Sequence, residues 1–381
     1  MQRKIAVMTG TRADFGLLRP LLTELARRPD ADLQLIVTGT HLSAAHGSTV
    51  TEITAAGFDI AAEVSIWGDD DSSEAAAVDT GAAVSSFAKT LSALKSDVVV
   101  VLGDRLEAFA MASAALILQI PVAHIHGGEL TLGAMDDSLR HAITKLSYLH
   151  FTTTDEHRSR VISLGEEPSR VFNFGAPVLD VLSTMQFMNR VELEAKFGVK
   201  FGARNALMTF HPAAFDEAPA GEMFAEILAA IDAVPDVHFI FTGTNNDIGS
   251  DEVRTMMKSF VGMRGDRISY VESFGQLGYL SAMREVDLVL GNSSSTVLEA
   301  PILGTPSVLV GNRQEGRPLG DSVLKVSADR AEILNGIKAA LVLGSEPASH
   351  PFGRAGFAEK AAEVLATHKF GVPLKKKFYE G

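Results

Sequence analysis

The stretch KIAVMTGTRADFGLLRPLLTELARRPDADLQLIVT, residues 4–38, contains two short apolar runs separated by an amphipathic one. The runs KIAVMT and LQLIVT have the length and composition of buried β-strands. Between them, LLRPLLTELARR has apolar residues at the spacing of a helix that buries one face. A strand, a helix and a second strand in this order form a βαβ unit with parallel strands. The stretch therefore predicts an α/β fold.

The same pattern recurs along the chain. Further strands are predicted by apolar runs at residues 97–103, 122–126, 206–210, 238–243, 268–271, 287–291 and 306–311. Several are continuous runs of Val, Ile and Leu, as expected for parallel strands that are covered by helices on both faces. An amphipathic run at residues 220–234 shows the intervening helical pattern. We predict two Rossmann-like, doubly wound α/β domains.

The chain length of 381 residues suits two domains, each with its own core. The strand pattern restarts after a polar, helix-forming stretch, NRVELEAKFGVKFGAR, at residues 189–204. We place the boundary near residue 180, which gives an N-terminal domain of residues 1–180 and a C-terminal domain of residues 181–363. The helical stretch GFAEKAAEVLATH can pack on either domain, and the basic tail LKKKFYEG is expected to be solvated.

The composition limits the kind of protein and the kind of ligand. The net charge of −13 argues against a general nucleic-acid binder, because nothing would neutralise a phosphate backbone over the whole surface. An anionic small molecule would need a local pocket of arginines and helix N-termini. The chain has no cysteine, which excludes disulfides, zinc–thiolate sites and cysteine nucleophiles. No apolar run reaches about 18 residues, so we expect a cytoplasmic protein without a membrane span.

The end of the first predicted strand offers a phosphate-binding position. In TGTRADFGLLRP, Gly10 permits a tight turn, and Arg12 lies at the start of the following helix. The unpaired N–H groups and the positive dipole end of a helix attract a phosphate. An ordinary strand–helix turn with a surface arginine explains the same residues.

A second candidate is the loop GNSSSTVLEAP, which follows the strand predicted at residues 287–291. Its small polar residues can cap a helix or turn their N–H and O–H groups toward a diphosphate. Glu299, further along, can accept hydrogen bonds from ribose hydroxyls. The next strand is followed by two arginines that can add positive charge, Arg313 and Arg317. Two such loops at strand ends fit a nucleotide diphosphate better than a simple metabolite, because ligands of open α/β sheets bind beyond the carboxyl ends of strands.

Ionisable residues also gather at predicted strand ends. Asp104 ends one strand and His211 follows another, where it is either functional or a satisfied strand-end histidine. His124 and His126 share one face if their strand continues through both. The His-x-His pair suits a metal, but the sequence has no HExxH pattern and no third ligand at a suitable spacing, so we predict no metal.

The segment that follows, GGELTLGAMDDSLRH, holds two pairs of ionisable residues at helical spacing. Asp136 and Arg140 are four residues apart, as are Asp137 and His141, so a helix would bring each pair together on one face. The pairs are either surface ion pairs or parts of a site.

Taken in order, several segments resemble the UDP-N-acetylglucosamine 2-epimerase family, most closely its hydrolysing branch, which serves the synthesis of sialic-acid-type sugars. The segments are TGTRADFGLLRPLL, LGDRLEAFA, HIHGGELTLGAMDDSLRHAITKLSYLH, GNSSSTVLEAP and GNRQEGRP. The resemblance implies two Rossmann-like domains in the GT-B arrangement, with the active site between them. It also implies that the C-terminal domain binds the nucleotide and that a C-terminal helix, placed at residues 364–381, packs back on the first domain.

The resemblance assigns roles residue by residue. Arg12, Ser293 and Ser294 match positions that hold the diphosphate, and Glu299 matches the ribose-binding carboxylate. The remaining residues of the predicted substrate-binding set are Glu129, Asn292, Ser295 and Arg313. The residues that match catalytic positions are Asp104, His126, Asp136, Arg140 and His211.

Two positions depart from the family pattern. Many relatives have a glutamate in place of His126, although other members of the hydrolysing branch share the HIHGGE sequence found here. Leu17 replaces a lysine of some relatives. Which groups serve as acid and base therefore stays open among His126, Asp104 and Asp136. We hypothesise that His126 takes over one proton transfer, since histidine acts near pH 7 with little tuning.

The implied reaction is elimination of UDP from UDP-N-acetylglucosamine to a 2-acetamidoglucal, followed by hydration to N-acetylmannosamine. It needs no cofactor and no metal, and the resemblance implies a homodimer or homotetramer. UDP-2,4-diacetamido-2,4,6-trideoxyglucose is an alternative substrate, used on the way to legionaminic acid. A non-hydrolysing epimerase, a GT-B glycosyltransferase and a catalytically silent nucleotide-sugar sensor are alternative functions.

Overall fold

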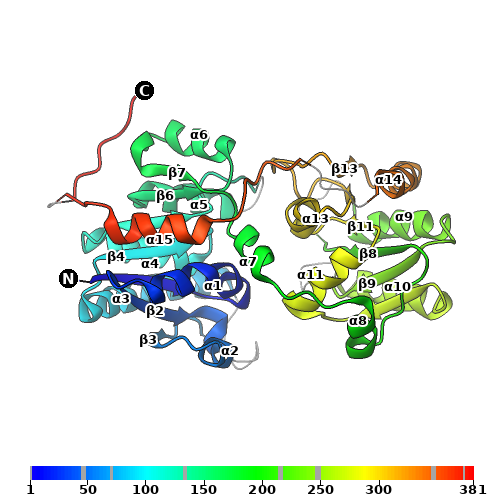
Figure 1. Ribbon diagram of the computed structural model, residues 1–381, viewed down its shortest axis with the longest axis horizontal. Helices are drawn as coiled ribbons and strands as arrows, with labels where there is room; N and C mark the ends of the chain where they lie inside the picture. Colours follow the sequence, from blue (N-terminus) through cyan, green and yellow to red (C-terminus); the bar gives the residue numbers. More distant parts are fainter. Residues whose placement is uncertain are drawn as a thin grey trace. The chain divides into compact units, whose positions relative to one another are not determined.

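The computed structural model describes residues 2–43, 49–68, 72–131, 135–212, 218–244, 250–344, 349–371 and 374–381. Strands and helices alternate along the chain, as the sequence predicts (Figure 1). The chain divides into two compact units, one of Met1–Thr184 with Phe352–Gly381 and one of Met185–Pro351. The first break lies close to the boundary predicted at residue 180, but the chain returns to the first unit at Phe352, earlier than predicted.

The first unit contains a seven-stranded sheet in the order β3-β2-β1-β4-β5-β6-β7, with every neighbouring pair parallel. Its strands are β1 (Arg3–Thr9), β2 (Ala31–Thr38), β3 (Ile60–Val64), β4 (Val98–Leu102), β5 (Val122–Ile125), β6 (Leu149–Thr152) and β7 (Val171–Asn173). The strand order reverses between β1 and β4, which makes this pair the switch point where doubly wound sheets bind ligands.

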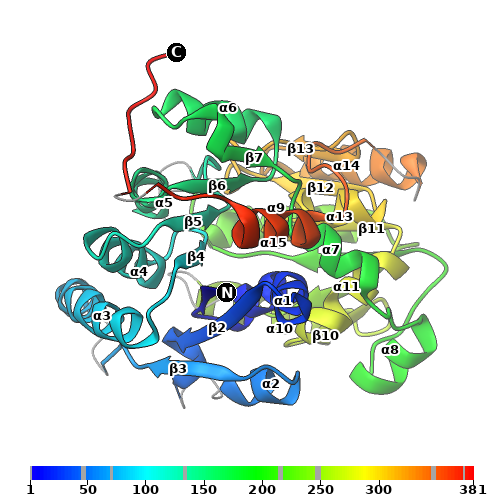
Figure 2. The same ribbon diagram turned by 60° about the vertical axis from the view of Figure 1, so that its left-hand side comes forward.

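The helices of the first unit connect its parallel strands. They are α1 (Arg12–Arg27), α2 (Val50–Ala55), α3 (Ser73–Leu94), α4 (Leu106–Ile117), α5 (Met135–Leu146), α6 (Asp155–Ser163), α7 (Val178–Thr184) and α15 (Phe357–Thr367). Short 3-10 turns in the described part of this unit are η1 (Gly39–Leu42) and η3 (Pro168–Arg170). Figure 2 shows α3 and α4 on one side of this sheet and α1 with α15 on the other.

The second unit contains a six-stranded parallel sheet in the order β10-β9-β8-β11-β12-β13. Its strands are β8 (Asn205–Thr209), β9 (His238–Thr242), β10 (Ile268–Val271), β11 (Leu288–Gly291), β12 (Ser307–Val310) and β13 (Val323–Val326). Its helices are α8 (Arg190–Phe197), α9 (Ala220–Asp232), α10 (Ser250–Met263), α11 (Gly275–Glu285), α12 (Ser294–Val297), α13 (Glu299–Leu303) and α14 (Arg330–Leu343). The order reverses between β8 and β11, so both sheets have the same doubly wound topology.

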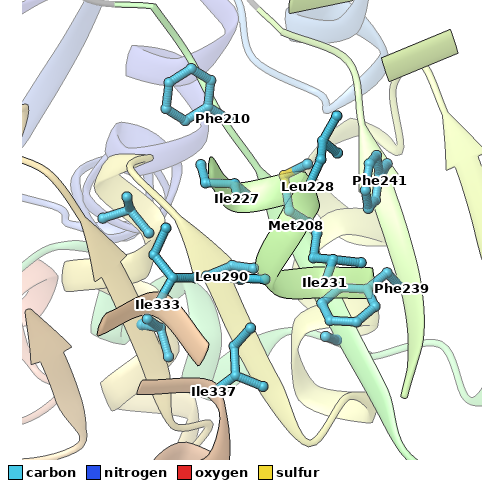
Figure 3. Close-up of a cluster of buried hydrophobic side chains, with 14 of the residues drawn as sticks. Met208, Phe210, Ile227, Leu228, Ile231, Phe239, Phe241, Leu290, Ile333 and Ile337 are labelled. Carbon is cyan, nitrogen blue, oxygen red and sulfur yellow. The ribbon is translucent and has the colours of Figure 1, made fainter. Parts of the chain in front are cut away.

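Apolar side chains on both faces of each sheet form the cores. On β1, Ile5 and Val7 join the cluster under α1 and α15, whereas Ala6 and Met8 join the cluster under α3 and α4. Figure 3 shows the corresponding cluster of the second unit, where Phe210 and Leu290 lie near helix residues such as Ile227. This two-sided burial explains the continuous apolar runs of the sequence and confirms the predicted doubly wound α/β fold.

Four strands escaped the sequence analysis: β3, β6, β7 and β13. Three of them, β3, β7 and β13, are sheet edges, and their burial is incomplete. The fourth, β6, is buried but contains polar residues, including His150. Edge strands and short strands with polar residues lack the apolar run that marks a central strand.

The last helix, α15, covers Phe357–Thr367, so the predicted range of residues 364–381 was wrong. Helix α15 packs against α1 of the first unit and buries Phe357, Ala361 and Leu365 there (Figure 1). The Asp180 carboxylate of α7 accepts hydrogen bonds from the backbone N–H groups of Gly356 and Ala358 at its first turn. These N–H groups have no partner within the helix, so Asp180 fixes where α15 begins.

The basic tail was expected to be solvated, and this is wrong for Lys376. Its Nζ lies 2.7 Å from the carbonyl oxygen of Lys145 and 2.6 Å from that of Ser147, at the end of α5, and 2.8 Å from the Glu166 carboxylate. The backbone N–H of Tyr379 donates to the carbonyl of Gly165 at 2.9 Å. The tail therefore contacts the first unit at defined positions. Within the described residues, no helix is long and apolar enough to cross a membrane.

Candidate active site

The loop after β1 begins with the predicted phosphate-binding residues. Thr11 caps α1 by accepting a hydrogen bond from the N–H of Asp14 at 3.2 Å. A Cβ on Gly10 would lie 2.5 Å from a carboxylate oxygen of Glu107, so only glycine fits this close approach. Arg12 is exposed and forms an ion pair with Glu52 of α2. An arginine in this exposed pair can exchange Glu52 for an anionic ligand at little cost, because exposed ion pairs are weak.

Three charged residues that the sequence analysis did not assign to the site lie at the switch point between β1 and β4. Arg105 donates to the buried carboxylate of Glu107 at 2.7 Å. Burial raises the pKa of Asp14, partly opposed by the charge of Arg105 and reinforced by that of Glu107. A carboxyl group with a raised pKa beside an arginine is typical of functional sites.

Asp104, directly after β4, forms an ion pair with Arg140 of α5. Arg140 is buried and also donates to the hydroxyl of Thr131 at 3.0 Å. The pairing brings together two predicted catalytic residues that lie far apart in the sequence. Asp136 lies on the exposed side of α5, in its first turn.

The neighbouring Asp137 holds the start of α5 in place. Its carboxylate accepts a hydrogen bond from the N–H of Thr131 at 2.8 Å and lies 3.6 Å from the ring of His141, the local pair that the helical spacing predicts.

His126 lies one residue beyond the end of β5. The strand therefore does not continue through both His124 and His126, so the condition for the two histidines to share a strand face is not met. Its φ of 68° is in the left-handed region, which non-glycine residues seldom adopt. Its Nδ1 lies 2.9 Å from Oε1 of Glu129. Its Nε2 is buried and has no hydrogen-bond partner among the described residues. Strained, partly unsatisfied groups of this kind cluster at functional sites.

Glu129, predicted to bind substrate, contacts a residue that the sequence analysis missed. Its Oε1 accepts a hydrogen bond from the hydroxyl of Thr153 at 3.1 Å, and the same hydroxyl lies 2.8 Å from Nδ1 of His157. Thr153 follows β6 and His157 lies in the first turn of α6. The sequence TTTDEH marks a helix start capped by Thr154, but no local signal shows that this start adjoins the HIHGGE loop.

The two glycines of HIHGGE allow this loop to pack closely. A Cβ on Gly128 would lie 2.4 Å from the carbonyl oxygen of His157, and one on Gly127 would lie 3.0 Å from Nδ1 of His124. His124 is fully buried between the carbonyl of Gly103 and the hydroxyl of Thr144. Burial lowers the pKa of His124 to about 3, so this histidine is a neutral part of the core.

In the second unit, His211 and Asn292 are joined across the switch point between β8 and β11. The buried Asn292 side chain accepts from the backbone N–H of His211 at 2.8 Å and donates to its carbonyl at 2.7 Å. Nδ1 of the His211 ring lies 3.4 Å from the hydroxyl of Thr244. A Cβ on Gly291 would lie 1.9 Å from the carbonyl oxygen of Thr209, so the sequence Gly-Asn is required where these strands end. Asn292 thus fixes the backbone that presents His211.

The serines after Asn292 form a hydroxyl cluster at the start of α12. The hydroxyl of Ser293 accepts from the N–H of Ser295 at 3.4 Å, and the two hydroxyls lie 3.1 Å apart. The hydroxyl of Tyr279 lies 2.7 Å from the hydroxyl of Ser295, a contact that was not predicted from the sequence. Ser294 is exposed. Capping and ligand binding are compatible here, since Ser293 caps the helix while Ser294 faces solvent.

Two further predicted residues lie beside this cluster. Arg313 donates to the carbonyl of Asn292 at 3.4 Å, as does Gln314 at 3.0 Å. Glu299 begins α13 and is half-buried. The structure therefore brings the predicted set of the second unit together around the end of β11.

Each unit places polar and charged groups at the carboxyl ends of its switch-point strands. Within the described residues, no group of three or more histidines or carboxylates is arranged to hold a metal ion. The available chemistry is proton transfer by imidazole and carboxylate, together with anion binding by arginine, hydroxyl and N–H groups. Fold and residues define the class: an α/β enzyme of the Rossmann type with sites suited to a nucleotide derivative.

Comparison with known proteins identifies the family. The family described as UDP-N-acetylglucosamine 2-epimerase matches residues 23–366. The chain is 35% identical over 316 residues to the GDP/UDP-N,N'-diacetylbacillosamine 2-epimerase (hydrolyzing) of Campylobacter jejuni, covering 83% of this chain and 82% of that protein. It is 38% identical over 336 residues to the Polysialic acid biosynthesis protein P7 of Escherichia coli, covering 88% of this chain and 85% of that protein.

The fold agrees with this assignment. The structure of UDP-GlcNAc 2-epimerase from Neisseria meningitidis bound to UDP-GlcNAc matches with a TM-score of 0.79 at 20% identity, covering 95% of this chain and 99% of that chain. The chain belongs to the UDP-N-acetylglucosamine 2-epimerase family and is similar to its hydrolysing branch.

Proposed function

We propose that the protein is a hydrolysing UDP-N-acetylglucosamine 2-epimerase, which converts UDP-N-acetylglucosamine and water to N-acetylmannosamine and UDP. The observation that supports this most directly is the His126–Glu129 pair. An ionised Glu129 accepts the Nδ1 proton of His126, which leaves Nε2 as the basic nitrogen of the neutral ring. Such a ring can remove a proton near pH 7.

The reaction begins with elimination. Nε2 of His126 takes the proton from sugar C2, the C2–H electrons form the C1–C2 double bond, and the C1–O bond breaks to release UDP. Water then adds at C1, and a proton returns to C2 from the opposite face. Asp104, paired with Arg140, and Asp136 are the other candidates for proton transfer. Because Nε2 is buried, substrate entry must open the contacts that cover it.

The leaving group needs help, since the C2 proton is weakly acidic. We assign Arg12, Arg313 and the Ser293–Ser295 hydroxyls to the diphosphate and Glu299 to the ribose. The geometry supports this assignment, because Arg12 is held only by an exposed ion pair within the described residues and Ser294 is exposed at the start of α12. Preorganised donors of this kind stabilise charge that develops on a departing phosphate.

A second substrate is favoured by one observation. The relative at 35% identity is described as acting on N,N'-diacetylbacillosamine, a 2,4-diacetamido sugar. We therefore keep UDP-2,4-diacetamido-2,4,6-trideoxyglucose as the alternative substrate. The same elimination and hydration apply, because that sugar also has a 2-acetamido group beside the C1–O bond to UDP.

The test is turnover of each nucleotide sugar in D₂O, followed by NMR. We expect free UDP and free N-acetylmannosamine with deuterium at C2. UDP-N-acetylmannosamine as the product would show a non-hydrolysing epimerase, and product from the diacetamido sugar alone would assign the alternative substrate. Binding of both sugars without turnover would refute the enzymatic proposal and support a sensor. Light scattering coupled to size-exclusion chromatography measures the molar mass of the protein in solution and so tests the proposed homodimer or homotetramer.

A further inference from the structure

We propose that Thr153 and His157 are positioning residues for the reaction: they hold the Glu129 carboxylate in place, and through it fix the orientation and tautomer of His126. This inference rests on the proposed function, in which His126 transfers a proton. It adds two residues to the site, from the end of β6 and the start of α6.

The contacts form one continuous chain of hydrogen bonds. His157 Nδ1 lies 2.8 Å from Thr153 Oγ1, which lies 3.1 Å from Oε1 of Glu129. The same Oε1 lies 2.9 Å from Nδ1 of His126. Because a threonine hydroxyl has one proton and an ionised carboxylate has none, the directions are determined. Nδ1–H of His157 donates to Thr153, whose hydroxyl donates to Glu129, and Nδ1–H of His126 donates to the same oxygen.

Burial makes this arrangement specific. Thr153 and His157 are 3% and 2% exposed, so water does not compete for their hydrogen bonds. Burial also lowers the pKa of His157 to about 4, which keeps its ring neutral with one N–H to donate. A buried network in which each proton has one acceptor favours a single arrangement of its members.

The backbone around His126 requires such support. Its left-handed conformation is unfavourable for a residue with a side chain, so the surrounding structure must hold the turn. Two contacts to α6 do this at the backbone: Gly128 packs against the carbonyl of His157, and the Arg160 guanidinium donates to the carbonyl of Gly128. Thr153 is the side-chain counterpart, since it connects α6 to the carboxylate that His126 contacts.

The adjacent Thr152 provides a matched control. It is also buried, but its hydroxyl donates to backbone carbonyl oxygens, that of Phe172 at 3.3 Å and that of Thr154 at 3.5 Å, and not to the Glu129 carboxylate. Substituting valine for either threonine removes one hydroxyl and keeps the side-chain shape. A general effect of hydroxyl loss on this strand end would therefore appear in both variants.

The experiment compares Thr153→Val, Thr153→Ser and Thr152→Val in steady-state turnover of the nucleotide sugar that the wild-type protein hydrolyses. We expect Thr153→Val to lower kcat about 10- to 100-fold, as for other partners that orient a reacting group, with KM within about twofold. Thr153→Ser should recover most of the loss, and Thr152→Val should match the wild type. Thr153→Ala replaces the valine variant if the latter does not fold, as judged by circular dichroism.

A second readout does not depend on activity. In protein with ¹⁵N-labelled histidine, the ring nitrogen shifts report which nitrogen has the proton, and His126→Gln identifies the signal of His126. We expect the Nδ1–H tautomer in the wild type and in Thr153→Ser, and a mixture of tautomers in Thr153→Val.

The two readouts separate the two proposals. Absence of wild-type turnover on either sugar would refute the proposed function, while the tautomer of His126 would still test the positioning role. Wild-type kcat and an unchanged tautomer in Thr153→Val would overturn the positioning role even if the enzyme hydrolyses its substrate. A loss in Thr153→Val that serine does not restore would also overturn it.

Discussion

Glu166 offers the strongest stability prediction, because it is a fully buried carboxylate with three positively charged or N–H partners. Nζ of Lys145 lies 2.5 Å from Oε1 of Glu166. Oε2 lies 3.0 Å from Nε2 of His150 and 2.8 Å from Nζ of Lys376. Burial alone would raise the pKa of Glu166, but the hydrogen bonds from these partners outweigh it and lower the pKa to about 2. The ionised form is therefore part of the folded state.

Replacing Glu166 by glutamine keeps the shape but removes the charge. Breaking a buried ion pair from one side costs about 3–5 kcal/mol. We expect the lower end of this range, because the side chains of Lys145 and Lys376 are 40% and 21% exposed and keep part of their hydration. Lys376→Met should cost less, about 1.5–3 kcal/mol, since Glu166 keeps Lys145 and His150. The double variant should be less destabilised than the sum, with a coupling of about 1–3 kcal/mol, because both single changes remove the same contact.

Urea unfolding followed by tryptophan fluorescence measures the free energy of unfolding of the first unit, which contains Glu166. The chain has one tryptophan, Trp67, and it packs against the core of the first unit. Glu167→Gln is the matched control, because the neighbouring glutamate is exposed and the same chemical change is made there. We expect the control to change the free energy of unfolding by less than about 0.5 kcal/mol.

Two results would refute this reasoning. If Glu166→Gln destabilised the first unit no more than Glu167→Gln, the buried carboxylate would not hold its partners together. If the effects of Glu166→Gln and Lys376→Met were additive, the tail would not act through Glu166.

Three further predictions concern the remaining site. Burial lowers the pKa of His124 to about 3 and of His157 to about 4, so the unfolded chain binds their protons first as the pH falls below about 6.5. These two residues alone should lower the free energy of unfolding by about 2–3 kcal/mol per pH unit near pH 5, and the buried His150, whose pKa burial lowers to about 4, acts in the same direction. Urea unfolding at several pH values measures this change, and a free energy that does not depend on pH would contradict it. Gly128→Ala should destabilise the first unit by more than the about 1–2 kcal/mol of a left-handed alanine and should abolish turnover, since the new Cβ meets the carbonyl of His157. Gly57→Ala has the same strain (φ 84° against 82°) without a described neighbour within 4 Å, so equal losses in both variants would exclude the close contact as the cause. Asn292→Ala should leave the backbone N–H and C=O after β8 unpaired and cost about 2–4 kcal/mol in the second unit, with weaker UDP binding by calorimetry; unchanged affinity would show that the loop does not depend on this side chain.

The fold class was predictable because central parallel strands are continuous apolar runs. The strand-end positions of Asp104 and His211 followed from the same runs, and the structure places both at switch points. Local sequence was a poorer guide to the strand that ends before His126, because VAHIH has strand-like composition through its last residue. Only the packing of Gly128 against α6, and of Gly127 against His124 and Thr144, shows why the chain turns there.

Partners distant in sequence were not predictable from spacing. Thr153 contacts Glu129 across 24 residues, and Lys376 contacts the end of α5 across more than 200. From the local sequence alone, Thr153 is interpreted as a hydroxyl at a strand end and Lys376 as part of a basic tail. Periodicity reports which face of an element is buried, but it does not report which polar side chains meet once the elements are packed.

The division of the chain has a consequence for synthesis. Helix α15 and the Lys376 contact complete the first unit, yet both are encoded after the whole of the second. Since a ribosome makes the chain from its N-terminus, the seven-stranded sheet emerges well before the helix that covers part of its apolar face. A nascent chain must keep that face protected until α15 has emerged. Truncated translation products should therefore expose it and be captured by chaperones or degraded.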